Sequence, residues 1–196
     1  MIRIETVLFA TWDEERPDDW MKPERMVPLD RATVPAGVAA NANIPGAVLL
    51  EMGGTTVLDH TNDTNVYIWW SFFLETLEDL SRATAAEEEM SFPDQPLKLK
   101  MRRAGDSVTC SLDYRNSRTK RRVQISASAS FDELLRKSLD EAERFYIRII
   151  ELDPGDADDI SKRLEQYVRS RRRRLGVSRW TDPGWMHPGG WGHPMA

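Results

Sequence analysis

The polar segment 59–63 contains the side chains best suited to acid–base chemistry. Asp59, His60 and Asp63 lie close together in the chain, and Asn62 adds an amide oxygen. An imidazole beside a carboxylate can act as a general base or bind a metal ion. The spacing matches no established motif, and the same residue types are typical of a loop that enters a helix. A hydrolase using Asp59, His60 and Asp63 is one hypothesis, and a loop with a surface histidine is the alternative.

The single cysteine, Cys110, occupies an apolar position in a predicted strand. A nucleophilic cysteine needs exposure and a nearby base, so a buried structural cysteine is the preferred interpretation. One cysteine excludes a disulfide within the chain and argues against a cysteine-based metal site. The sequence contains no G-x-S-x-G, no phosphate-binding glycine loop and no H-E-x-x-H motif. We therefore predict no catalytic residue, no metal and no cofactor, although an enzyme is not excluded.

Two groups of basic residues have the charge needed to bind a nucleic acid. One surrounds a predicted turn between strands, and the other ends a predicted helix. Their members are Arg118, Lys120, Arg121, Arg122, Arg171, Arg172, Arg173 and Arg174. Such clusters bind phosphates by releasing counterions, but the predicted strands offer no aromatic ring on which bases could stack. Nucleic-acid binding is the alternative, and pairing within the chain or exposure to solvent is the simpler interpretation.

Acidic and aromatic residues provide three candidate surfaces for binding another protein. They are an acidic loop, an aromatic residue beside the main apolar stripe of a helix, and a Trp/Gly/Pro-rich tail. The candidate contact residues are Asp13, Glu14, Glu15, Asp18, Asp19, Phe72, Trp180, Trp185 and Trp191. Acidic groups suit a basic partner, and tryptophan rings are frequent interface anchors that fit an aromatic-accepting groove. A solubilising loop, a helix buried on two sides and a tail without a role are the alternatives.

The stretch 64–80 predicts the helix around which the core forms. Its large apolar residues recur at helical spacing and make one stripe: Val66, Trp69, Trp70, Phe73, Leu74, Leu77 and Leu80. Burial of each such side chain contributes about 1.5–3 kcal/mol. Asp63 or Thr64 is predicted to cap this helix, because an oxygen at that position can accept a bond from a free backbone N–H.

Antiparallel strands are predicted on both sides of this helix. Residues 47–59 contain two β-prone runs joined by Gly53-Gly54, which is typical of a tight hairpin. Residues 97–129 alternate apolar and polar side chains through three strands and predict a meander with one buried face.

Other segments are less regular. Residues 2–11 predict a first strand, whereas residues 13–46 are broken by proline and glycine and predict loops. Residues 85–90, with their run of glutamates, predict an exposed acidic segment.

Two further helices are predicted near the C-terminus. Ser130 and Glu133 form the S-x-x-E pattern of a capping box ahead of an apolar-periodic run. Asp156 or Asp158 is suited to capping the next helix, and Gly176 is a plausible residue for its end.

Length and composition favour one soluble domain. The chain has 196 residues, of which 40% are hydrophobic, and a net charge of −5. Residues 1–100 hold 8 Lys/Arg against 18 Asp/Glu, and residues 101–196 hold 19 against 14. The two halves can attract each other within the fold or form opposed surface patches. No run is long enough to span a membrane and the N-terminus lacks a signal-peptide pattern, so we expect a cytoplasmic protein.

These patterns together predict an α+β fold. We expect an antiparallel sheet of about five to six strands with two to three helices on one face, forming a single domain over residues 1–176, and a tail over 177–196. The leading functional hypothesis is a non-catalytic protein-binding module, such as an immunity or inhibitor protein or an accessory subunit of a bacterial complex. It rests on size, acidity and missing catalytic motifs, which is analogy rather than chemistry.

Overall fold

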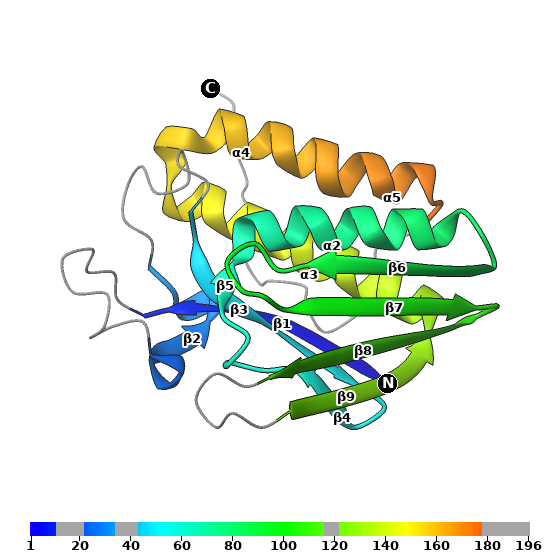
Figure 1. The fold of residues 1–196 in the computed structure, drawn as a ribbon. Helices are drawn as coiled ribbons and strands as arrows, with labels where there is room; N and C mark the ends of the chain where they lie inside the picture. The colour runs from blue at the N-terminus through cyan, green and yellow to red at the C-terminus, as the bar shows by residue number, and fades with distance from the viewer. Residues whose placement is uncertain (11–21, 34–42, 116–121, 178–196) are drawn as a thin grey trace.

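Two antiparallel sheets and three helical segments make up the structure, a computed structural model that describes residues 1–10, 22–33, 43–115 and 122–177 (Figure 1). The first sheet has the strand order β2-β1-β3-β4, with β5 also paired to β3. Its strands are β1 (Ile2–Phe9), β2 (Met26–Pro28), β3 (Pro45–Met52), β4 (Thr55–Leu58) and β5 (Thr64–Asn65). The predicted hairpin is confirmed as β3–β4, and Gly53 and Gly54 take φ angles of 58° and 81° in its turn.

The second sheet follows the chain in the order β6-β7-β8-β9. Its strands are β6 (Ala85–Ser91), β7 (Lys98–Ala104), β8 (Ser107–Arg115) and β9 (Arg122–Ser130). The predicted meander is confirmed as β7–β9, with buried Leu99 opposite Leu112 and Cys110 opposite Ala127. Residues 85–90 were predicted only as an exposed acidic segment: they form strand β6, in which Glu87 and Glu89 are exposed but Met90 is buried in the core.

The helical segments are α2 (Val66–Ser81), α3 (Phe131–Leu152) and a C-terminal helix. The C-terminal helix consists of α4 (Ala157–Arg163), the π-helical η4 (Leu164–Arg169) and α5 (Ser170–Arg174). Short 3₁₀ turns occur at Pro23–Arg25 (η1), Leu29–Arg31 (η2) and Pro154–Asp156 (η3). Gly176 has a φ of 64°, and the N–H groups of Gly176 and Val177 donate to the carbonyls of Arg173 and Arg172, so the predicted glycine end is confirmed.

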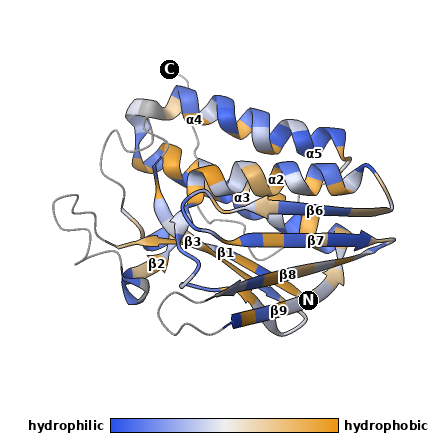
Figure 2. Ribbon diagram, in the orientation of Figure 1, coloured by the Kyte–Doolittle hydropathy of each residue, from blue (hydrophilic) through white to orange (hydrophobic). Residues whose placement is uncertain are grey.

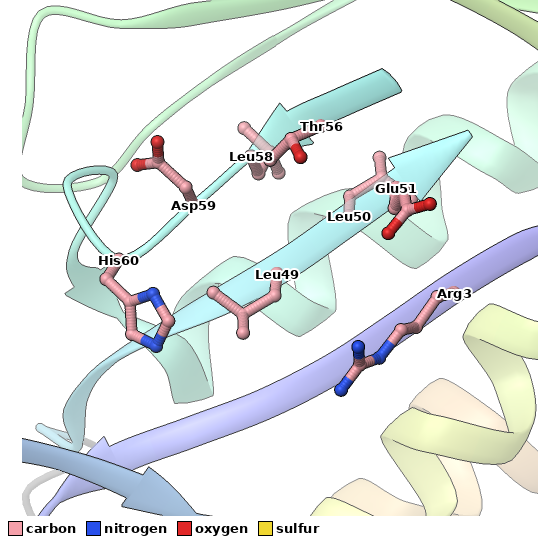
Figure 3. A pocket seen from close by; sticks show the side chains of 8 residues that line it. All are labelled: Arg3, Leu49, Leu50, Glu51, Thr56, Leu58, Asp59 and His60. Atoms are coloured by element: carbon pink, nitrogen blue, oxygen red, sulfur yellow. The ribbon is translucent and has the colours of Figure 1, made fainter. Parts of the chain in front are cut away.

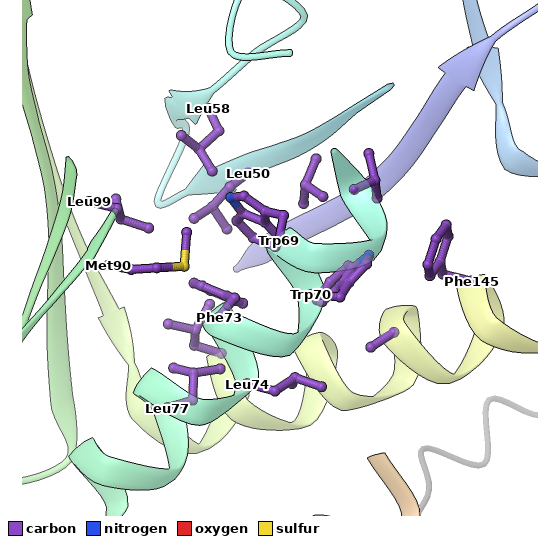
Figure 4. Packing of buried hydrophobic residues seen from close by; sticks show 14 of the residues in the cluster. Leu50, Leu58, Trp69, Trp70, Phe73, Leu74, Leu77, Met90, Leu99 and Phe145 are labelled. Carbon is purple, nitrogen blue, oxygen red and sulfur yellow. The ribbon is translucent and has the colours of Figure 1, made fainter. Parts of the chain in front are cut away.

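Helix α2 is the centre of the core, as its apolar stripe predicts. Its inward side chains are buried between the two sheets and α3 (Figure 4). The indole Nε1 of Trp70 donates to the hydroxyl of Thr6 on β1 over 3.2 Å. The cap differs from the prediction: the side chain of Asn65, rather than Asp63 or Thr64, accepts the N–H of Ile68. Thr64 and Asn65 belong to the short strand β5, which places the cap one residue later.

Helix α3 lies along β1 and supplies hydrogen-bond acceptors to its backbone. Ser130 accepts the N–H of Glu133 and caps the helix as predicted. The Glu133 carboxylate instead accepts the N–H of Ile2 over 2.8 Å, and that of Glu141 accepts the N–H of Thr6 over 2.7 Å. Burial raises the pKa of Glu141, against the opposing effect of its ion pair with Arg144. Strand β2 pairs with β1 only at Val7–Phe9. The two carboxylates accept hydrogen bonds from backbone N–H groups in the part of β1 that β2 does not reach.

The α+β class with antiparallel strands and three helical segments is confirmed. The strands divide between two sheets, which share one buried cluster of apolar side chains rather than forming a single sheet. In colours of hydropathy, apolar residues concentrate on β1 and β3, and the C-terminal helix is mostly hydrophilic (Figure 2). Its apolar residues Ile160, Leu164 and Val168 are buried in the core, and its arginines form ion pairs with α2 and α3.

Candidate functional site

A hollow lies on the outer face of the first sheet, where β1, β3 and β4 run side by side (Figure 3). Successive residues of a strand point to opposite faces, so Leu50 packs into the core while Leu49 and Glu51 point outward. Pairing between β1 and β3 sets Arg3 opposite Glu51, and the β4 pairing sets Thr56 beside Glu51. The hollow has a volume of about 480 Å³ and is completed by Asp59 and His60 after β4.

The polar groups of this hollow are only partly occupied by contacts within the chain. The Arg3 guanidinium bonds to the Glu5 carboxylate over 2.7 Å. Within the described residues, the side chains of Glu51 and His60 have no hydrogen-bond or ion-pair partner. His60 and Leu49 lie at one end of the hollow, and Arg3 and Glu51 at the other (Figure 3). The arrangement can hold a small molecule through charges at one end and an apolar contact at the other.

The residues of the hydrolase hypothesis do not come together as one constellation. The Asp59 carboxylate accepts the N–H and hydroxyl of Thr61 over 2.8 and 2.6 Å, which is a local turn. Asp63 accepts the side-chain amide of Gln95 over 2.7 Å, and it is not among the residues that line the hollow. The described residues therefore contain no carboxylate–imidazole pair at His60, and the hydrolase remains a prediction.

Cys110 lies fully buried on β8. Burial raises the pKa of its thiol to about 12, so the thiol is protonated near neutral pH and suited to packing. Among the described residues, no group of three or more His, Cys, Asp or Glu side chains is placed to hold a metal ion.

The arginines at the end of the C-terminal helix contact carboxylates on other elements. Arg171 and Arg174 both bond to Glu78 on α2, over 2.7 and 2.9 Å. Arg172 bonds to Asp140 over 2.8 Å and lies 3.3 Å from Glu143, both on α3.

The remaining described arginines of the two predicted basic groups are paired as well. Arg173 pairs with Glu165 on the same helix. Arg122 on β9 bonds to Asp113 over 2.8 Å, and this contact, with a bond from Gln124, lowers the pKa of Asp113 to about 2. Nucleic-acid binding through these arginines remains a prediction. Their guanidinium groups already form contacts within the chain, which favours the simpler interpretation of pairing within the fold.

The Glu78 contact gives a prediction about acid. Burial alone raises the pKa of Glu78, but the bonds and charges of Arg174 and Arg171 outweigh it and hold the pKa below its ordinary value of 4.5. A carboxyl with a lowered folded-state pKa stabilises the fold above its unfolded-state pKa, and this contribution is lost as pH falls through the folded-state pKa. Glu78→Gln is therefore expected to destabilise the protein near neutral pH and to differ less from wild type in acid.

Urea unfolding followed by circular dichroism, at neutral pH and at several values below 4.5, measures this convergence. Glu75→Gln is the control, since Glu75 lies exposed on the same helix without an ion pair among the described residues. A wild-type advantage over Glu78→Gln that stayed constant into acid would contradict the prediction.

An exposed aromatic side chain lies on the outer side of α2. Phe72 is 43% exposed, although its neighbours Trp69, Trp70 and Phe73 are fully buried. Partly exposed Ile68 precedes it by one turn, and exposed Glu75 follows it by one turn. We call Ile68, Phe72 and Glu75 the Phe72 face.

Most other candidate contact residues lie outside the described part of the chain. These residues are Asp13, Glu14, Glu15, Asp18, Asp19, Trp180, Trp185, Trp191, Arg118, Lys120 and Arg121. Of the predicted partner-binding set, the structure describes Phe72 alone, and it places Phe72 at the surface.

Arg3, Leu49 and Glu51 were not singled out from the sequence. Their only signal was alternation within two apolar strands, and which residues meet depends on a pairing register that the sequence does not display.

None of the described helices combines the length and the apolar composition that crossing a membrane requires. Comparisons with protein-family models, curated proteins and solved structures gave no match, so functional interpretation rests on the side chains described above.

Proposed function

We propose that the chain is a non-catalytic protein-binding module that contacts a basic partner through Phe72 and its helix neighbours Ile68 and Glu75. One observation carries the proposal: an aromatic side chain is 43% exposed in the middle of a helix whose other large rings are buried. Exposed aromatic rings are common anchors in protein interfaces, because they bury a large area with little loss of conformational freedom.

The charge beside Phe72 supports a basic partner. Glu75 has no ion-pair partner among the described residues, whereas Glu78 on the same helix is paired with arginines of this chain. An unpaired carboxylate beside an apolar contact favours lysine or arginine on the opposing surface and speeds association. An immunity or inhibitor protein acting on a basic target, or an accessory subunit of a larger complex, fits this chemistry.

The proposal predicts that Phe72→Asp strongly reduces capture of the partner. The full chain is immobilised, partners are captured from a lysate of the source organism, and the bound proteins are quantified by mass spectrometry. Loss of a central aromatic anchor costs about 2 kcal/mol or more, so the affinity for the partner, and with it the enrichment, is expected to fall about thirtyfold or more. Ile147→Asp is the matched control, because Ile147 is a similarly exposed apolar residue on α3, at 38%.

A chain ending at Gly176 separates this surface from the tryptophan-rich tail. The proposal expects that chain to retain the same partner. Equal enrichment by wild type and Phe72→Asp would contradict the proposal, as would recovery of nucleic acid alone that is removed by salt.

A further inference from the structure

We propose that the hollow on the outer face of the first sheet binds a free α-amino acid with an aliphatic side chain. Its volume of about 480 Å³ lies within the usual range for small-molecule sites, about 300–1,000 Å³. This inference is independent of the protein-binding proposal, because the hollow is on the outer face of the first sheet and Phe72 is on α2.

The charged end of the hollow matches the two charges of a zwitterion. Arg3 and Glu51 are direct partners across β1 and β3, so their side chains leave the sheet on the same face. Glu51 has no partner among the described residues and can accept a ligand ammonium group. A hydrogen bond to Glu5 occupies part of the Arg3 guanidinium, whose five N–H groups leave donors for a ligand carboxylate.

The other end of the hollow suits an apolar side chain. Leu49 points outward and is partly exposed, and the half-buried His60 ring lies beside it (Figure 3). An aliphatic group placed over Leu49 would be bounded by the imidazole on one side and by Thr56 and Glu51 on the other. Removing this apolar surface from water favours binding, while the charged groups fix the orientation.

The same residues disfavour other ligand classes. Glu51 and Asp59 add two carboxylates to the lining, which repels a phosphate group. The described residues contain no cluster suited to a metal ion, which argues against a divalent cation.

Titration of the ¹⁵N-labelled full chain with leucine, followed by NMR, tests the inference. Leucine is expected to shift the amide signals of Leu49, Glu51 and His60 in a saturable manner. Leucinamide lacks the carboxylate and N-acetylleucine lacks the ammonium, so each is expected to bind at least about tenfold more weakly. Equal binding of leucinamide would overturn the inference in favour of a peptide N-terminus, equal binding of N-acetylleucine would overturn it in favour of a peptide C-terminus, and no saturable shift would overturn it outright.

A Glu51→Gln variant tests the assignment of Glu51 to the ammonium group. It keeps the shape of the side chain and removes the charge, and it is expected to weaken leucine binding at least about tenfold. Glu87→Gln is the matched control, because Glu87 is an exposed glutamate on β6, outside the hollow. Unchanged leucine affinity in Glu51→Gln would overturn the assignment of the ammonium group.

Discussion

Replacing Trp70 with alanine is expected to lower the free energy of unfolding by about 3–5 kcal/mol. The side chain is fully buried, and its ring centroid lies 5.1 Å from that of Trp69 and 6.1 Å from that of Phe73. Its removal leaves a cavity at the centre of the core and deprives the buried Thr6 hydroxyl of a donor. Because domains are stable by only about 5–15 kcal/mol, this is a large share of the total.

Urea unfolding followed by far-ultraviolet circular dichroism measures the loss of stability. Phe72→Ala is the control on the same helix, and because its side chain is 43% exposed we expect a loss of less than about 1 kcal/mol. Trp70→Phe retains most of the ring and gives a folded intermediate case if the alanine variant fails to fold. Similar losses in Trp70→Ala and Phe72→Ala would show that α2 is not the centre of the core.

Replacing Arg172 with alanine is expected to lower the free energy of unfolding by about 1.5–3 kcal/mol, the usual contribution of hydrogen bonds between charged groups. Its side chain is 9% exposed and contacts Asp140 and Glu143, of which the Glu143 side chain is 8% exposed. Removal of Arg172 takes one charged partner from each of these carboxylates, while Glu143 keeps Arg169 at 3.5 Å. The C-terminal helix is expected to loosen first, because Arg172 joins it to Asp140 and Glu143 on α3.

Arg173→Ala is the matched control from the next position in the chain. Arg173 is 65% exposed and pairs with Glu165 on its own helix, so its loss is expected to cost about 0–1 kcal/mol. Hydrogen exchange measured by mass spectrometry locates the effect, with faster exchange expected in α4 and α5. Equal stabilities for the two variants would show that burial of Arg172 does not govern attachment of this helix.

The periodic parts of the fold were predictable from the sequence. The stripe of α2 and the alternation in β7–β9 are set by which side chains must leave water, so local spacing carries the information. Strand β6 escaped prediction because glutamates at 87–89 hide the alternation, and only Met90 signals a buried face. The neighbouring strand supplies what local preference lacks, with Lys100 opposite Glu89 and Arg102 opposite Glu87.

The candidate sites were less predictable because they depend on contacts between distant segments. Phe72 was identified from its position off the apolar stripe, which is local information. The hollow requires the register between β1 and β3, some 48 residues apart at Arg3 and Glu51. Likewise, Glu133 was predicted to complete a capping box, but the N–H of Ile2 occupies its carboxylate. Such competition between local and distant partners is not visible in a short motif.

The acceptors that α3 offers to β1 bear on how the protein behaves when it is partly unfolded. A strand with unpaired N–H groups is a template for pairing with another chain and so for aggregation. Glu133 and Glu141 occupy the N–H groups of Ile2 and Thr6, and they do so only while α3 is docked. Undocking of this one helix would open both the apolar core and a strand edge at once. The colloidal stability of the protein is thus tied to a helix rather than to the sheet that would aggregate.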